Sequence, residues 1–234
     1  IGAASQQGTQ QGNIARQALL RAGLPVSVAG MSLDRQCASG MMAIATAAKE
    51  IIEDGMTITV GGGVESVSLT RNEHFRTDRA RDPWFETYLP TLYMTMIETA
   101  ENVAQRYGIS REAQDEYSYQ SQMRTANAQN SGLLDTEIVP LKSQMKIKEK
   151  ETGKILTKEV TLKNDEGNRP NTTLDGLSSL EPVFKDGIYL KKGNYITAGN
   201  ASQLSDGASA SVLMEAKEVE KRGLQPLGIY RGIS

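Results

Sequence analysis

The stretch Asp34-Arg-Gln-Cys-Ala-Ser-Gly-Met-Met-Ala-Ile-Ala45 places the single cysteine of the chain, Cys37, directly before a run of small and apolar residues. From Ala38 to Ala48 almost every residue is small or apolar, which is typical of a helix buried on most sides. We therefore predict a helix that begins near Cys37 and ends at about Glu53. Free N–H groups at a helix start favour a thiolate and stabilise an oxyanion, so Cys37 is a candidate nucleophile. On position alone, a small buried core cysteine is an equally open interpretation.

A short β-type run, Met56-Thr-Ile-Thr-Val60, follows this helix and leads into Gly61-Gly-Gly63. We predict a strand over 56–60 and a tight turn with close backbone packing at the glycines. The glycines match neither the GxGxxG nor the P-loop spacing, so they do not indicate a phosphate site. A helix, a strand and a glycine turn in this order predict an α/β domain with parallel strands.

The composition argues against several classes of function. The 234 residues carry 26 Lys and Arg against 28 Asp and Glu, and a net charge of −2 gives no electrostatic footprint for nucleic acid or an anionic membrane. No run of about 18 apolar residues occurs, so we expect no membrane span. One Cys and one His leave little material for a metal site, and we expect none. The histidine, His74, lies in a charged loop, where we expect it to be solvated.

The rest of the chain divides into segments of different amino-acid composition. Residues 1–69 and 197–226 are rich in small residues around β-type runs, whereas residues 70–196 carry clustered charges and polar helices. We therefore predict an α/β core interrupted by an inserted domain. The chain starts at Ile1 without Met and ends in a pattern typical of a strand start, so we expect sequence to be missing at both ends. Further predicted elements are helices over 12–24, 97–107, 110–130 and 215–222, a solvated hairpin over 142–163, and a buried strand at Val212–Met214.

Five segments, taken in order, resemble the thiolase family. The cysteine stretch followed by Val60-Gly-Gly-Gly-Val-Glu-Ser66 resembles the acyl-cysteine segment of thiolases. The other segments are Thr99-Ala-Glu-Asn-Val-Ala-Gln-Arg-Tyr-Gly108, Glu137-Ile-Val-Pro140, Arg169-Pro-Asn-Thr-Thr-Leu-Asp175 and Ile196-Thr-Ala-Gly-Asn-Ala-Ser-Gln-Leu-Ser-Asp-Gly-Ala-Ser-Ala210. The resemblance implies an incomplete thiolase-like layered α/β fold. Residues 1–69 and 197–226 would form the N-terminal core, 70–196 a loop domain covering coenzyme A, and 227–234 the start of a C-terminal domain.

The resemblance also implies an activity, an acyl-CoA C-acyltransferase. Such an enzyme cleaves 3-ketoacyl-CoA with CoA or runs the reverse Claisen condensation, in fatty acid and lipid metabolism. Cys37 would be the catalytic nucleophile that carries the acyl group, with its backbone N–H contributing to an oxyanion hole. Coenzyme A would be a substrate rather than a tightly bound cofactor. The implied contacts are Arg169 at the adenine end, Ser202 with Ala198 and Ala201 along pantetheine, and Met96 beside the acyl pocket.

Several departures from the family pattern qualify this prediction. The chain contains no Gly-His-Pro triplet and no second Cys, which the family carries in its C-terminal half. We therefore expect the 234-residue chain on its own to be inactive. Thr95 stands where short-chain biosynthetic members carry His, and Gln203 replaces a Gly common in those members. Both changes leave acyl chain length and reaction direction open.

Two other classes of protein remain as alternatives. One is a truncated, non-catalytic CoA-binding or structural remnant of a thiolase, and the other is a ketoacyl synthase of the same superfamily. The Arg-Gln-Cys-Ala-Ser-Gly context argues against the synthase. For the complete protein the resemblance implies acyl-CoA partners and a homodimer or homotetramer. We expect a cytoplasmic location, with an organelle matrix as the alternative.

Overall fold

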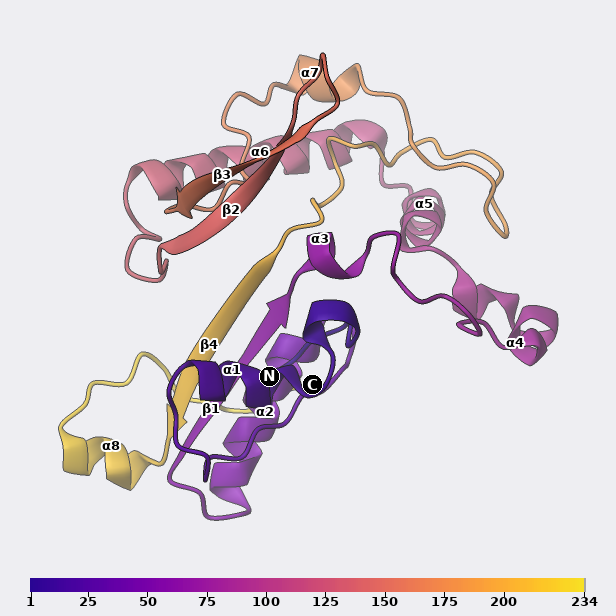
Figure 1. The fold of residues 1–234 in the computed structure, drawn as a ribbon. Coiled ribbons are helices and arrows are strands. Elements are labelled where there is room, and N and C mark those ends of the chain that lie inside the picture. Colours follow the sequence, from indigo (N-terminus) through magenta and orange to yellow (C-terminus); the bar gives the residue numbers. More distant parts are fainter. Residues whose placement is uncertain (234) are drawn as a thin grey trace. The chain divides into compact units, whose positions relative to one another are not determined.

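The computed structural model describes residues 1–233, which form two compact units. The first unit comprises Ile1–Ala80 and the chain from Leu204 onward, and the second comprises Arg81–Gln203. The first unit contains η1 (Gly8–Gln10), α1 (Ile14–Arg21), α2 (Ser39–Ile52), β1 (Ile58–Glu65), α3 (Val67–Thr70), β4 (Gly207–Met214) and α8 (Ala216–Arg222) (Figure 1). The second contains α4 (Pro83–Tyr88), η2 (Pro90–Tyr93), α5 (Met96–Tyr107), α6 (Arg111–Asn130), β2 (Leu141–Lys148), β3 (Ile155–Leu162) and α7 (Leu174–Ser178).

Most predicted helices are confirmed, together with the local signals that define their ends. The side chain of Asn13 accepts a hydrogen bond from the backbone of Arg16 and caps α1, and Ser110 caps α6 in the same way through Ala113. Helices α5 and α8 each end at a glycine in the left-handed conformation. The predicted hairpin is formed by β2 and β3, which pair antiparallel from Leu141↔Leu162 to Lys148↔Ile155.

The strand pairing of the first unit differs from the prediction of a parallel sheet. β1 and β4 are antiparallel, in register from Ile58↔Met214 to Glu65↔Gly207. Parallel pairing occurs as isolated bridges from Gly2 to Leu33 and Gly63. The physical reason is the path of the chain. The chain leaves the sheet at Glu65, the last residue of β1, and re-enters it at Gly207, the first residue of β4, which pairs with Glu65. The two strands must therefore run in opposite directions.

The three consecutive glycines lie inside β1, so the predicted turn is wrong, but the close backbone packing is confirmed. A Cβ at Gly61 would lie 2.6 Å from the Cα of Ile44 in α2, and one at Gly63 would lie 3.2 Å from the Cα of Gly40. Helix α2 therefore rests directly on the strand backbone. Figure 1 shows α2 lying along β1 and β4. The glycines allow the backbones of α2 and β1 to approach closely, and they do not reverse the chain.

The face of the sheet turned away from α2 is apolar and exposed. Val60 and Val212 pair across the strands and are 50% and 68% exposed. The predicted strand at Val212–Met214 is confirmed as part of β4, but the prediction that it is buried is wrong. Helix α2 packs on the opposite face, where the Thr59 hydroxyl donates to the Ala47 carbonyl at 2.9 Å.

Two buried glutamates of α5 hold the long loop that follows α7. The carboxylate of Glu98 accepts hydrogen bonds from the N–H groups of Ile188, Tyr189 and Leu190 at 2.6 to 3.1 Å. The carboxylate of Glu101 accepts from Asn194, Tyr195 and Ile196 at 2.7 to 3.2 Å. Both side chains are 1% exposed. Burial opposes ionisation of Glu98, but the three N–H donors and the charge of Lys191 outweigh it, so its pKa lies below the ordinary value.

The close contact between α2 and β1 gives a first prediction. Gly61→Ala places a methyl group against the backbone of Ile44, and overpacking of this kind should lower the free energy of unfolding by about 1–3 kcal/mol. Gly207→Ala is the matched control, because nothing lies within 4 Å of its Cβ position and it belongs to the partner strand. Urea denaturation followed by circular dichroism measures both. Equal stability of the two variants would contradict the packing argument.

The carboxylate of Glu98 gives a prediction of pH dependence. Its folded pKa lies below the ordinary value of 4.5, so the folded state binds fewer protons than the unfolded state and stability rises with pH. This contribution is complete above pH 4.5 and is lost as the pH falls through the lowered folded pKa. The stability gap between wild type and Glu98→Gln should therefore narrow in acid. Urea midpoints between about pH 3 and pH 7 test this, with Glu151→Gln on the exposed hairpin turn as control. A gap independent of pH would contradict it.

Candidate active site

The candidate nucleophile lies on a tight turn in front of α2. Helix α2 begins at Ser39, so Cys37 precedes the helix, and the prediction that the helix begins near Cys37 is wrong by two residues. The cause is the side chain of Ser39, which donates to the Gln36 carbonyl at 2.5 Å and accepts from the Arg35 N–H at 2.8 Å. These bonds hold residues 35–38 in a turn, and Gln36 has a φ of +51°, which a helix does not allow.

The turn leaves Cys37 exposed, two residues before the first residue of α2. The Asp34 carboxylate accepts from the Gln36 N–H at 2.7 Å and fixes the start of the turn. Cys37 follows this strained residue and is exposed, so the interpretation as a buried core cysteine is wrong. The N–H groups of Gly40 and Met41 donate to no acceptor within residues 1–233, as expected in the first turn of a helix. An exposed thiol beside free amides can attack a carbonyl and have the resulting oxyanion stabilised.

The other predicted site residues belong to the second unit. Ala198, Ala201 and Ser202 lie on the turn after Thr197, and the side chains of Ala201 and Ser202 are exposed. Arg169 is exposed in the loop between β3 and α7. Met96 is the first residue of α5 and is 77% exposed, directly after Thr95, whose side chain caps that helix.

The structure brings the Ser202 turn and the Arg169 segment together. The side chain of Gln203 donates a hydrogen bond to the Gly167 carbonyl, which joins the residue after Ser202 to the loop that carries Arg169. Helix α6 supports this loop through Gln122, whose side-chain oxygen accepts from the Arg169 N–H at 2.8 Å. Two segments predicted to contact the same ligand are therefore neighbours in one unit.

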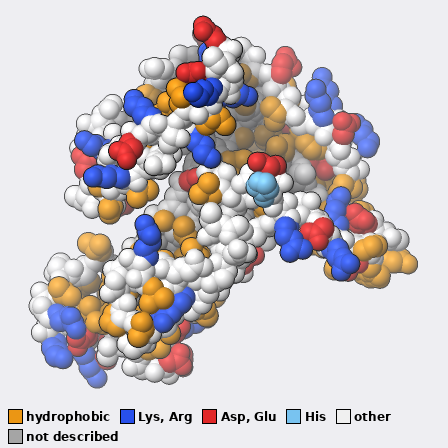
Figure 2. Space-filling model, viewed as in Figure 1, with side chains coloured by type: hydrophobic (Ala, Val, Ile, Leu, Met, Phe, Trp, Pro, Cys, Tyr) orange, Lys and Arg blue, Asp and Glu red, His pale blue; other side chains and the backbone are white. Residues whose placement is uncertain are grey.

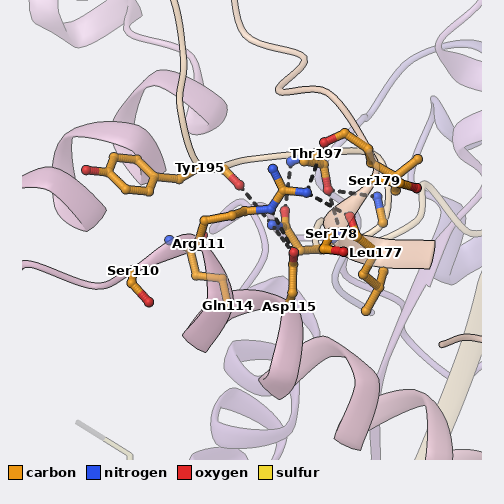
Figure 3. A network of polar contacts seen from close by, with 12 residues as sticks. Ser110, Arg111, Gln114, Asp115, Leu177, Ser178, Ser179, Tyr195 and Thr197 are labelled. Carbon is orange, nitrogen blue, oxygen red and sulfur yellow. Dashed lines mark hydrogen bonds and ion pairs between the residues drawn. The ribbon is translucent and has the colours of Figure 1, made fainter. Parts of the chain in front are cut away.

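The turn itself is held from its buried side by a polar network (Figure 3). The Asn200 side chain accepts from the Thr197 N–H at 2.8 Å and donates to the Tyr195 carbonyl at 2.9 Å and to the Asp115 carboxylate at 3.0 Å. Asp115 also accepts from the Arg111 guanidinium at 2.8 Å. Thr197 is fully buried and Asp115 is 3% exposed. Ala198, Ala201 and Ser202 of the same turn are exposed.

Sequence reasoning missed the residues that position the site. Asp115, Gln122 and Glu101 were read only as polar positions of helices, although each is a hydrogen-bond partner of a distant loop. Asp115 and Gln122 lie in a helix that was predicted only as polar, whereas Glu101 lies in one of the segments that resemble thiolases. Asp206, directly before β4, was also not among the predicted site residues. Its carboxylate accepts from the Ser68 N–H at 2.9 Å, and these bonds overcome burial and lower its pKa.

Charged side chains of both signs and the single histidine lie at the surface. Figure 2 shows Lys and Arg interspersed with Asp and Glu on the visible face. His74 is exposed, with its Nε2 atom 3.7 Å from a Glu73 carboxylate oxygen. Within residues 1–233, no group of three or more His, Cys, Asp or Glu could hold a metal ion. None of the helices described for these residues is long and apolar enough to cross a membrane.

Comparison with known proteins identifies the family. The family model "Thiolase, N-terminal domain" matches residues 1–217. Beta-ketoadipyl-CoA thiolase of Pseudomonas putida is 38% identical, over 100% of this chain and 58% of that protein. The peroxisomal 3-ketoacyl-CoA thiolase A of Rattus norvegicus is 38% identical, over 93% of this chain and 48% of that protein. The crystal structure of human mitochondrial 3-ketoacyl-CoA thiolase in complex with CoA matches with a TM-score of 0.75 at 33% identity, over 97% of this chain and 55% of that one.

The chain spans about half the length of the curated relatives that it matches. Its mixed content of helices and strands agrees with a partial α/β thiolase fold. The relatives include peroxisomal and bacterial proteins. From the family match over residues 1–217 and the likeness to solved thiolases, we conclude that this chain belongs to the thiolase family.

Proposed function

We propose that the complete protein is an acyl-CoA C-acyltransferase that cleaves 3-ketoacyl-CoA with CoA, or runs the reverse Claisen condensation, through Cys37. The observation that carries the proposal is the exposed cysteine on a strained turn directly before the free amides of α2. The names of the relatives add the class of substrate, since they are 3-ketoacyl-CoA and beta-ketoadipyl-CoA thiolases.

In the thiolysis direction, the Cys37 thiolate adds to the 3-keto carbon of the substrate. The negative charge that develops on the carbonyl oxygen is stabilised by N–H groups at the start of α2. Collapse of this adduct breaks the bond between carbons 2 and 3, and the departing two-carbon enolate takes up a proton to become acetyl-CoA. The thiol of CoA then gives up its proton and attacks the acyl-cysteine, which releases the shortened acyl-CoA and restores the thiolate.

Substrate binding in this proposal uses the second unit. Ser202, Ala198 and Ala201 contact the pantetheine arm of CoA, and Arg169 contacts the adenine end. The hydrogen bond from Gln203 to Gly167 supports this assignment, because it makes the two segments adjacent. Met96, exposed at the start of α5, borders the acyl pocket. CoA acts as a substrate and not as a tightly bound cofactor.

The exposed apolar face of the sheet supports a further part of the proposal. We propose that in the complete protein Val60 and Val212 are covered on assembly into a homodimer or homotetramer, because exposed apolar faces of this kind mark interfaces.

Replacing the nucleophile tests the chemistry. Cys37→Ser in the complete protein should abolish acyl transfer while CoA binding stays nearly unchanged, because a hydroxyl is far from ionised near pH 7 and the change is nearly isosteric. The measurements are thiolysis of acetoacetyl-CoA and of a longer 3-ketoacyl-CoA, with mass spectrometry for the acyl adduct. Full activity of the variant would show that Cys37 is not the nucleophile. The 234-residue chain serves as a second control and should give no turnover, because it holds one Cys and one His. Turnover by that chain would also count against the assignment.

The oligomeric state tests the proposed interface. Light scattering of the complete protein should give the mass of a dimer or tetramer. Val212→Asp, which puts a charge on the exposed apolar face, should shift the population toward smaller species, whereas Lys158→Asp on the exposed hairpin should not. A monodisperse monomer of the wild type would refute this part of the proposal.

A further inference from the structure

The turn that carries Ser202 is built around Asn200. Its side-chain oxygen accepts from the Thr197 N–H, and its side-chain nitrogen donates to the Tyr195 carbonyl. The Thr197 hydroxyl accepts from the N–H groups of Gly199 and Asn200, both at 3.2 Å. These bonds close the loop on itself, so the backbone from 197 to 200 has one conformation. They do not by themselves determine where that loop lies in the unit.

The location of the loop is determined by one carboxylate on α6. Asp115 accepts from Asn200 through one oxygen at 3.0 Å and from Arg111 through the other at 2.8 Å. The Arg111 guanidinium reaches past Asp115 to the carbonyls of Leu177 and Leu180, at 2.7 and 2.9 Å. Figure 3 shows these groups converging between α6 and α7. Asp115 therefore connects the Ser202 turn to α6 directly and to the end of α7 through Arg111.

Packing presses the same turn against α7. A Cβ at Gly199 would lie 2.6 Å from side-chain carbons of both Leu177 and Leu180. The turn thus has van der Waals contact on the face held by Leu177 and Leu180 and a charged hydrogen bond to α6. If the hydrogen bond is lost, the leucines still contact the turn, but they do not fix its orientation, because dispersion contacts are not directional.

We propose that Asp115 is a positioning residue for the pantetheine arm of the CoA substrate. This inference rests on the proposed function, in which Ser202 and the alanines of the turn meet that arm. Asp115 is itself 3% exposed and does not touch the substrate. It acts through Asn200 by holding the turn at the place where its exposed side meets the ligand.

A carboxylate is required at this position because both of its oxygens must accept. Asn200 and Arg111 each present an N–H donor, and an ionised carboxylate has two acceptor oxygens. In Asp115→Asn, the amide oxygen can accept from one partner only, and the amide nitrogen then faces a second donor. The Arg111 side, which is charged, keeps the oxygen because charge-assisted bonds are stronger. The bond to Asn200 is therefore the one that is lost.

The experiment is steady-state thiolysis by the complete protein, with CoA varied at saturating acetoacetyl-CoA. Asp115→Asn should raise KM for CoA about tenfold and leave kcat within about twofold, because substrate binding is weakened and the reacting cysteine is untouched. Calorimetric binding of CoA should weaken by a similar factor. Asp135→Asn is the matched control, an exposed carboxylate of the same unit outside the network, and should leave both constants unchanged.

A double-mutant cycle separates positioning from a general loss of stability. Ser202→Ala should raise KM about fivefold, the cost of one neutral hydrogen bond. If Asp115 acts through the Ser202 turn, the double variant should raise KM by clearly less than the product of the two single effects. A residue that only supports stability would give independent effects, lower the amount of active enzyme and leave KM unchanged.

The outcomes distinguish the two levels of the proposal. If the wild-type protein neither binds CoA nor shows thiolysis, the proposed function is wrong and this inference falls with it. If the wild type is active and Asp115→Asn has an unchanged KM, or an additive cycle, the positioning role is wrong and the proposed function stands. Should Asp115→Asn fail to fold, Asp115→Ser replaces it, because the shorter neutral side chain removes the charged acceptor of Asn200 and leaves the bond from Asn200 to the Tyr195 carbonyl in place. Increased hydrogen exchange at the Gly199 and Asn200 amides, together with the KM rise, is then the expected result, and unchanged exchange would overturn the inference.

Discussion

Buried carboxylates that accept hydrogen bonds from loop N–H groups and side chains are the interaction on which the second unit depends. Its buried hydrophobic side chains are Ala104, Leu177, Phe184 and Ile196, which is a small core for the loop that passes over them. Buried backbone N–H groups need acceptors, and a loop has no ladder to provide them. The carboxylates of Glu98 and Glu101 accept these hydrogen bonds directly. The carboxylate of Asp115 instead fixes Asn200, whose side chain provides an acceptor for the loop.

The first unit is constrained in a different way, by the absence of side chains. Gly61 and Gly63 let α2 approach the strand until backbone nearly touches backbone, and Gly2 adds a third point at which a Cβ would overlap Ser39. The N-terminus of α2 is therefore fixed against the sheet. Because the cysteine turn is bonded to Ser39, the position of Cys37 follows from the position of that helix end.

The candidate residues are divided between the two units, and each unit holds its own residues by a different means. The first carries the exposed Cys37 on the turn before α2, and the second carries two segments joined by the hydrogen bond from Gln203 to the Gly167 carbonyl. In each unit an exposed turn is held by buried groups. Ser39 holds the turn that carries Cys37, and Asp115 holds the turn that carries Ser202 through Asn200. This division matches general experience that functional loops need a fixed scaffold to hold their geometry.

Features with local causes were predictable. Asn13 and Ser110 cap helices through bonds to residues three positions away, and Gly153 with its neighbours closes a hairpin between two alternating strands. Cys37 was also recognised as the candidate nucleophile from its neighbours, although the helix begins two residues later than predicted. The Ser39 hydroxyl bonds to the preceding backbone and delays the helix, and composition does not show which way a serine side chain turns.

The sequence by itself determined the helices α1, α2, α5, α6 and α8, the hairpin, and the family resemblance carried by ordered motifs. Only the tertiary structure decided that Gly61–Gly63 form a strand, that β1 and β4 are antiparallel, and that Asp115 holds the Ser202 turn. The physical reason is range. A cap or a hairpin turn is stabilised by groups a few positions apart, whereas strand direction and buried acceptors depend on where a chain segment returns after a long excursion.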